Sequence, residues 1–407
     1  MRNARIGLSA ALALSLAACS GSYGSAVGVD AVAGLEALPE VTLTEPPTRD
    51  PSELQVLFWS DEQRNARFRD MESWFAGHEV PASLTPSTLE KGAPLSASLQ
   101  TELRAYIQES NAAGIMVLQG GKVRFEEYGL GMSKDDRWTS FSVAKSFTST
   151  LLGAAVKDGF IRSLDDPVTN YISELKGSAY EGVTVEQIAT MTSGVAWNED
   201  YTDPESDVSQ LNRFVVEFGP DAIVEQMKRL KREAPAGEKF VYKTGETNLL
   251  GLIVENASGL PLAEYSQTKI VEPAGLEGAM FWMTDPRGGN IGGCCLSLRL
   301  SDYARVGEFV RKGGIGTDGE AVVPQGWFAK AGSPLVDFGN GFGYGYQWWT
   351  YPGDNYGAQG IFGQSIAIVP QSDLVVAVIS NWPAAQSSTF RNKGAALVAK
   401  IAFSPRE

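Results

Sequence analysis

The strongest chemical signal in this chain is a serine followed three residues later by a lysine, in Ser142-Val143-Ala144-Lys145. The apolar spacing after this motif predicts a helix, which puts Ser142 in its first turn and Lys145 on the same face. A hydroxyl at that end lies near the positive end of the helix dipole. A buried lysine has a lowered pKa and can accept the hydroxyl proton. The pair therefore predicts a nucleophilic serine with a lysine base.

Two other tetrapeptides have the same S-x-x-K pattern, Ser173 to Lys176 and Ser266 to Lys269, so the pattern alone is weak. Ser173 leads into a Gly-Ser loop and Ser266 lies inside an amphipathic segment, and we interpret both as structural. Tyr242 ends a strand-like approach to a predicted helix, where a phenolate could act as a base. Because most of the 13 tyrosines are expected to be packing residues, Tyr242 is only a candidate at this point.

Composition narrows the possible chemistry. The chain has 407 residues, a net charge of −14 and one histidine, His78. The acidic balance disfavours nucleic acid as a partner, since phosphate binding needs a basic patch. One histidine excludes most histidine-based metal sites and leaves His78, expected in a surface loop, as the only base for a Ser-His-Asp triad. We expect no metal and no cofactor.

The first residues are typical of an export signal. Arg2 and Arg5 precede an apolar run that is too short to span a bilayer and ends in Leu16-Ala17-Ala18-Cys19. This ending resembles the bacterial lipoprotein signal, which implies cleavage after residue 18 and lipidation of Cys19. The alternative is an ordinary secretory signal with an incidental cysteine. By analogy with sorting rules, Ser20 implies an outer-membrane lipoprotein that faces the periplasm.

The sequence pattern divides the rest of the chain into a tether, strands and helices. Residues 19–52 lack periodicity and predict a flexible tether. Strand patterns at 114–119 and 122–128 are joined by two glycines, and further strand patterns occur at 344–350, 365–369 and 374–380. The middle is helical, and a last helix covers about 390–403. We therefore predict an α/β (α+β) fold with an antiparallel sheet flanked by helices. The α/β domain would comprise residues 53–145 and 276–407, and an all-α insertion domain would comprise residues 146–275.

Two of the three cysteines, Cys294 and Cys295, are adjacent. Adjacent cysteines rarely pair because the eight-membered ring strains the peptide between them. We expect no structural disulfide.

Taken together, the motifs resemble the serine hydrolases of the penicillin-recognising superfamily, which includes class C β-lactamases, DD-peptidases and related esterases and amidases. These show S-x-x-K, then Y-x-N or a variant, then K-T-G or H-x-G, in that order. The supporting segments are Phe160-Ile161, Leu164 to Val168, Val183 to Gln187, Met191 to Gly194 and Asp302 to Gly307. The resemblance covers about residues 55–403. It implies that Ser142 is acylated, that Lys145 is its base and that Tyr242 relays the leaving-group proton.

The chain departs from that pattern at two positions. Thr244 stands where β-lactamases usually have Asn, and the tripeptide that begins at Lys243 only imitates K-T-G. By glycine spacing, the third motif is Ala358-Gln359-Gly360, so the lysine that would bind a β-lactam carboxylate is absent. The resemblance implies that Gly360 belongs to the oxyanion turn and that the N–H of Ile361 is the second oxyanion donor, opposite Ser142.

The stretch from Ser193 to Pro204 is similar to the active-site loop of the 6-aminohexanoate-dimer (nylon oligomer) hydrolases, which implies that Tyr201 holds the substrate amide. An ordinary loop aromatic is the alternative. The leading hypothesis is a lipid-anchored serine hydrolase that cleaves a carboxylic ester or small linear amide. The alternatives are a DD-peptidase or β-lactamase, and a non-catalytic binding lipoprotein of the same fold. The sequence does not predict an oligomeric state.

Overall fold

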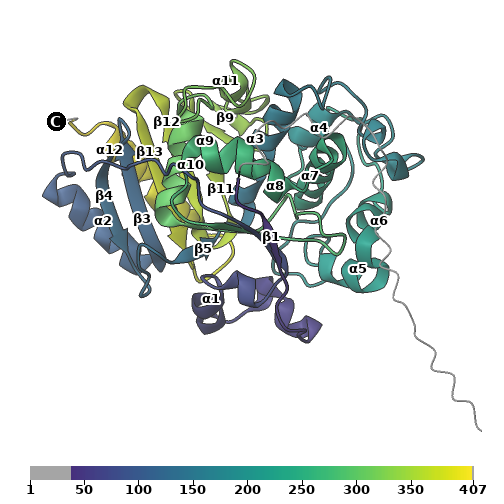
Figure 1. The fold of residues 1–407 in the computed structure, drawn as a ribbon, viewed down its shortest axis with the longest axis horizontal. Helices are drawn as coiled ribbons and strands as arrows, with labels where there is room; N and C mark the ends of the chain where they lie inside the picture. The colour runs from purple at the N-terminus through teal and green to yellow at the C-terminus, as the bar shows by residue number, and fades with distance from the viewer. Residues whose placement is uncertain (1–37, 406–407) are drawn as a thin grey trace, which may run out of the picture. The chain divides into compact units, whose positions relative to one another are not determined.

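A computed structural model describes residues 38–405. Its largest sheet has eight antiparallel strands in the order β4-β3-β13-β12-β11-β10-β9-β8 (Figure 1). The strands are β3 (Ala112–Gln119), β4 (Lys122–Tyr128), β8 (Val336–Gly339), β9 (Phe342–Tyr344), β10 (Trp349–Tyr351), β11 (Asn355–Gln359), β12 (Ser365–Val369) and β13 (Leu374–Ser380). The predicted antiparallel sheet is confirmed, and β13 pairs with β3 across a long sequence separation. The run at 344–350 is two strands with a turn between them.

Helices cover both faces of this sheet. Helices α2 (Ala97–Glu109) and α12 (Ser388–Ala402) lie on one face, and α10 (Leu300–Arg311) lies on the other (Figure 1). Side chains alternate along a strand, so neighbouring residues of β13 enter different cores. Val376 packs in the cluster with α2 and α12, whereas Val375 packs in the larger cluster with α10.

A second, five-stranded sheet was not predicted. Its order is β1-β2-β6-β7-β5. The strands are β1 (Thr42–Thr44), β2 (Gly77–Val80), β5 (Arg137–Thr139), β6 (Met280–Met283) and β7 (Leu296–Arg299). These strands are too short to show a clear alternation. His78 lies in β2, where it is buried with Nδ1 3.2 Å from Asn290 Oδ1, so the prediction of a surface loop histidine was wrong.

The predicted tether is shorter than expected. Thr44 pairs with Gly77 between β1 and β2, and Gln267 Nε2 donates a hydrogen bond to the Pro39 carbonyl at 2.8 Å. From Pro39 onward the chain therefore packs on the folded body, and the tether prediction was wrong for that part. The predicted signal at residues 1–18, Cys19 and the start of the tether lie outside the described residues.

The middle of the chain is helical. Between β5 and β6, the described structure contains no strand of either sheet. The helices there are α3 (Ala144–Lys157), α4 (Val185–Ala189), α5 (Leu211–Phe218), α6 (Ala222–Lys228), α7 (Thr244–Ser258), α8 (Leu262–Ser266) and α9 (Glu272–Ala274). Helix α3 packs against α7. The division into two domains at residues 145 and 275 remains a prediction.

Two short helices lie outside this region, α1 (Asp61–Arg67) and α11 (Trp327–Ala331). A capping box opens α1, in which Ser60 and Gln63 each accept from the backbone N–H of the other, and the helix ends at Arg67.

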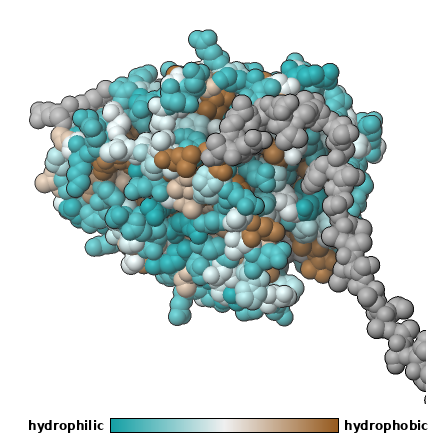
Figure 2. Space-filling model, in the orientation of Figure 1, coloured by the Kyte–Doolittle hydropathy of each residue, from teal (hydrophilic) through white to brown (hydrophobic). Residues whose placement is uncertain are grey.

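In the turn before β7 the Sγ atoms of Cys294 and Cys295 lie in contact, where no disulfide was expected. This turn holds the two side chains together. Hydrophilic residues cover most of the face shown in Figure 2, with small separate apolar patches. Within residues 38–405, no helix combines the length and the apolar character that crossing a bilayer requires.

Candidate active site

Ser142 lies in a single 3-10 turn, Phe141–Val143, that leads directly into α3. The turn is anchored to β7: Ser140 N–H donates to the Leu296 carbonyl at 2.7 Å, and Leu296 N–H donates to Ser140 Oγ at 3.0 Å. Phe141 has φ +44°, a left-handed conformation that costs energy for a residue with a side chain. Ser142 is partly exposed while both of its neighbours are buried, so its hydroxyl is accessible.

Lys145 is almost completely buried beside this hydroxyl. Its Nζ donates hydrogen bonds to Ser142 Oγ at 3.1 Å, to Thr244 Oγ1 at 2.9 Å and to the Gly293 carbonyl at 2.8 Å. Burial lowers the pKa of Lys145 to about 8, and the negative charge of Glu199 partly opposes this shift. A tenth or so of the side chains would then be neutral at pH 7 and able to accept a proton.

Tyr242 lies on the loop before α7. The Lys145 Nζ is 5.2 Å from its ring centroid, and the ring stacks on Trp349 with 5.6 Å between centroids. Burial and the charge of Glu199 raise the pKa of Tyr242, and a side-chain hydrogen bond with Ser142 offsets part of the rise. Tyr242 is therefore a neutral phenol near neutral pH, able to donate a proton. The structure brings the three predicted residues together.

Glu199 is a site residue that sequence reasoning missed. Its carboxylate accepts hydrogen bonds from the Thr244 N–H at 2.9 Å, the Thr244 hydroxyl, the Trp197 indole N–H and the Tyr201 hydroxyl. Thr244 therefore connects Glu199 to Lys145. Since an acid in a polar loop is usually solvated, no sequence signal separated Glu199 from its neighbours, although it stands two residues before the predicted Tyr201.

Tyr201 is connected to the site by a hydrogen bond to the Glu199 carboxylate. Its hydroxyl is 2.8 Å from Glu199 Oε1, and only 8% of the residue is exposed. Burial is the main cause of its raised pKa, with a further contribution from the Glu199 charge. The predicted loop residue thus lies beside the Ser-Lys-Tyr group, as a neutral phenol.

The turn after β11 lies against the turn that contains Ser142. A Cβ at Gly360 would come within 2.6 Å of the Ser140 carbonyl oxygen and 3.2 Å of the Phe141 Cβ, so this approach requires glycine. Gly360 N–H donates to the Gln364 carbonyl at 2.8 Å, which closes the turn that contains Ile361. Ala358 is buried in β11 and supplies no cation there.

Lys243 does not supply the cation that is missing at Ala358. It is completely buried, with its Nζ 3.5 Å from Glu246 Oε1. Glu246 also accepts from the Tyr180 hydroxyl at 3.2 Å. The lysine of the Lys243-Thr244-Gly245 tripeptide therefore forms a buried ion pair with Glu246.

A row of aromatic rings runs from solvent to Tyr242. Phe338 is 47% exposed and its ring centroid is 5.0 Å from that of Phe240. Phe240 contacts Tyr344 at 5.2 Å, and Tyr344 contacts Trp349 at 5.0 Å. This row forms an apolar wall beside Tyr242. No group of three or more histidine, cysteine and acidic side chains able to hold a metal ion occurs in the part of the chain that the structure describes.

The chain was compared with known proteins. Residues 103–400 match the protein family described as Beta-lactamase. A 6-aminohexanoate-dimer hydrolase from Paenarthrobacter ureafaciens is 31% identical over 299 residues, which cover 69% of this chain and 76% of that protein. A beta-lactamase from Pseudomonas fluorescens is 23% identical over 236 residues, which cover 55% of this chain and 59% of that protein.

The fold is also found among solved structures. A Bacillus anthracis protein provisionally assigned as a 6-aminohexanoate-dimer hydrolase superposes with a TM-score of 0.75 at 21% sequence identity. The superposition covers 87% of this chain and 98% of the Bacillus chain. The likeness confirms the predicted fold class.

Proposed function

We propose that this chain, a serine hydrolase that belongs to the beta-lactamase family, cleaves a carboxylic ester or small linear amide through an acyl-Ser142 intermediate. The observation that carries the proposal is the 3.1 Å contact between Ser142 Oγ and the buried Nζ of Lys145. The lowered pKa of Lys145 matters for this contact because only a neutral amine can accept the serine proton.

The reaction follows from these groups. Neutral Lys145 takes the proton of Ser142 Oγ as this oxygen bonds to the substrate carbonyl carbon. The N–H groups of Ser142 and Ile361 stabilise the resulting oxyanion. Tyr242 protonates the leaving alcohol or amine as the bond to the carbonyl carbon breaks, and regains a proton through Lys145. Water then attacks the acyl-serine with the same groups as bases, releasing the acid and restoring Ser142.

The choice of an ester or linear amide rests on two features. Ala358 leaves no lysine on β11 for the carboxylate of a β-lactam, which would cost that ligand a charge-assisted hydrogen bond of about 1.5–3 kcal/mol. The aromatic row from Phe338 to Trp349 offers an apolar wall for an uncharged chain. Identity to a 6-aminohexanoate-dimer hydrolase favours a linear amide as one substrate class.

The test is labelling of the full chain with a fluorophosphonate followed by intact mass. We expect one adduct that Ser142→Ala abolishes and Ser173→Ala, in another S-x-x-K tetrapeptide, retains. An adduct that survives Ser142→Ala would contradict the assignment of the nucleophile, and no adduct on folded protein would favour a binding protein. Turnover of p-nitrophenyl esters, 6-aminohexanoate amides and nitrocefin then ranks the substrates, and a preference for nitrocefin would favour the β-lactamase alternative.

The lipid anchor and the location are further parts of the proposal. The support is the sequence Leu16-Ala17-Ala18-Cys19 followed by Ser20. Radiolabelled palmitate should enter the chain in a Gram-negative host and should not enter Cys19→Ser, and the labelled chain should fractionate with the outer membrane. A chain without label in the soluble fraction would indicate an ordinary secretory signal.

A further inference from the structure

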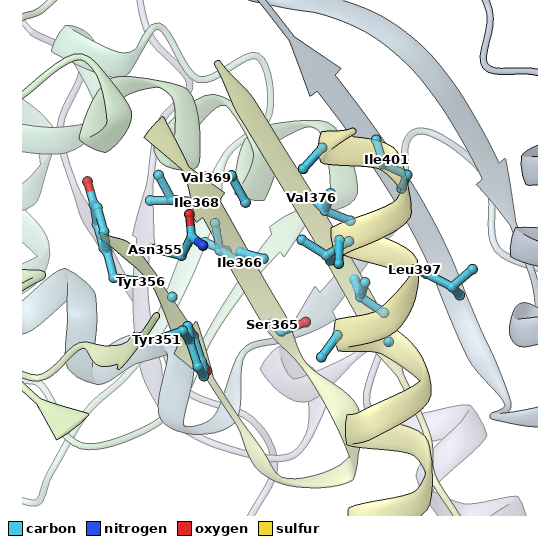
Figure 3. A pocket seen from close by; sticks show the side chains of 18 of the residues that line it. Tyr351, Asn355, Tyr356, Ser365, Ile366, Ile368, Val369, Val376, Leu397 and Ile401 are labelled. Atoms are coloured by element: carbon cyan, nitrogen blue, oxygen red, sulfur yellow. The ribbon is translucent and has the colours of Figure 1, made fainter. Parts of the chain in front are cut away.

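A groove separate from the Ser-Lys-Tyr site lies between α12 and the large sheet. Its volume is about 760 Å³. Helix α12 runs alongside the strands that carry Ser365, Val369 and Val376, with Tyr351 and Asn355 at the groove's other side (Figure 3). Neither Ser142, Lys145 nor Tyr242 lines it. These three side chains therefore do not belong to the groove, although its lining includes Ala358 and Gln359, which precede Gly360.

Several small residues line this groove. Gly357 pairs with Ala367 across β11 and β12, and both line the groove, as do Gly394 and Ala395 of α12. A volume of this size lies within the range of small-molecule sites, about 300–1,000 Å³. The largely apolar lining favours an alkyl chain, which leaves water on binding.

The groove also contains one cation without an acidic partner. Arg391, on the first turn of α12, donates from Nη2 to the Gly360 carbonyl at 3.2 Å, and its guanidinium lies 4.7 Å from the Trp382 ring centroid. Among residues 38–405 it forms no salt bridge and no other side-chain hydrogen bond. By contrast, Lys393 and Lys400 of the same helix pair with Glu109 and Glu102.

Arg391 is partly buried, and this burial lowers the pKa of its guanidinium. An anion that binds the unused N–H groups would gain charge-assisted hydrogen bonds. The planar fork of a guanidinium matches a carboxylate in geometry and charge. The charge at one end and the apolar floor along the rest thus complement a molecule with an anionic head and an alkyl tail.

We propose that this groove binds an alkyl carboxylate, with the carboxylate on Arg391 and the chain along the strands that carry Ala367 and Val369. The site does not depend on the acyl transfer proposed for Ser142.

Isothermal titration calorimetry of the full chain with dodecanoate, below its micelle concentration, tests this. Wild type should bind dodecanoate at least about tenfold more tightly than dodecanol, as expected for a charge-assisted hydrogen bond. Arg391→Gln should lose that preference, whereas Lys393→Gln, an exposed cation of the same helix, should keep it. Dodecyltrimethylammonium, with the opposite charge, should bind no better than dodecanol.

A second variant covers the case in which Arg391→Gln does not fold. Ala367→Phe fills the groove floor without touching the guanidinium, and it should abolish dodecanoate binding while the fluorophosphonate adduct still forms. No saturable binding to wild type, or equal binding by wild type and Ala367→Phe, would overturn the proposal.

Discussion

Phe141 and Phe362 pack against each other with 5.3 Å between ring centroids, and both have a left-handed backbone, with φ of +44° and +56°. Phe141 directly precedes Ser142, and Phe362 directly follows Ile361. The two strained turns that would hold the serine and an oxyanion donor are thus joined by this aromatic contact, and Phe68 packs against both rings. Because such backbone geometry persists only where packing enforces it, we expect this contact to help fix the distance between the two turns.

Replacing Phe362 by Leu should therefore reduce turnover more than stability. Leu keeps most of the buried volume, so the free energy of unfolding should fall by only about 1 kcal/mol. The turn that contains Ile361 loses its ring contact, and kcat for ester cleavage should fall about 10- to 100-fold, since small displacements of reacting groups are costly. Phe309→Leu, which alters a buried ring on α10, is the control. Equal kcat losses in both variants would contradict the role of the Phe141 contact.

Glu199 should control the pH dependence. The rate of acylation should rise with pH through an apparent pKa of about 8, because Lys145 acts as a base only when neutral. The negative charge of Glu199 raises the pKa of Lys145, so Glu199→Gln should lower that pKa and shift the profile toward lower pH. Stopped-flow acylation with a p-nitrophenyl ester measures this. Glu205→Gln, an exposed acid of the same loop, should leave the profile unchanged.

The Tyr242→Phe variant removes the hydroxyl and keeps the aromatic ring, so it tests the role of the hydroxyl alone. The ring would still stack on Trp349, so the melting temperature should change little. Loss of the proton donor should reduce kcat by about 10²- to 10⁴-fold, as for other general acids. Tyr344→Phe, which removes a hydroxyl from the adjacent ring, should retain turnover within a few fold. A Tyr242→Phe enzyme with normal kcat would leave Lys145 as the only proton carrier.

Lys243 and Glu246 should behave as a coupled pair in unfolding. Lys243→Met leaves a buried carboxylate without its cation, which should cost about 3–5 kcal/mol. Adding Glu246→Gln should restore part of this loss, because the amide can still accept from Tyr180 and carries no charge. Urea unfolding of both single variants and the double variant gives the coupling energy. Strictly additive losses would show that the two side chains do not interact.

Sequence analysis predicted contacts between residues close in the chain and missed contacts between distant segments. Ser142 and Lys145 were placed together correctly because helical spacing fixes their relation within four residues. The contact between Glu199 and Thr244 joins a loop to the first residue of α7, far apart in the chain, and no local periodicity indicates it. Strand β1 was missed for the same reason. Its composition is typical of a loop, and it forms a strand because it pairs with the edge of β2.

The position of β13 has a consequence for the order of assembly. This strand is the last one in the described residues, yet it lies in the sheet between β3 and β12. Strands β11 and β12, on either side of Gly360, therefore cannot join β3 in the sheet until residues 374–380 have been synthesised. Pairing across such sequence separations is slow because loop closure must come first. A nascent chain would thus contain Ser142 long before the proposed oxyanion site is complete, and hydrolytic activity would have to wait until β13 has been synthesised and paired.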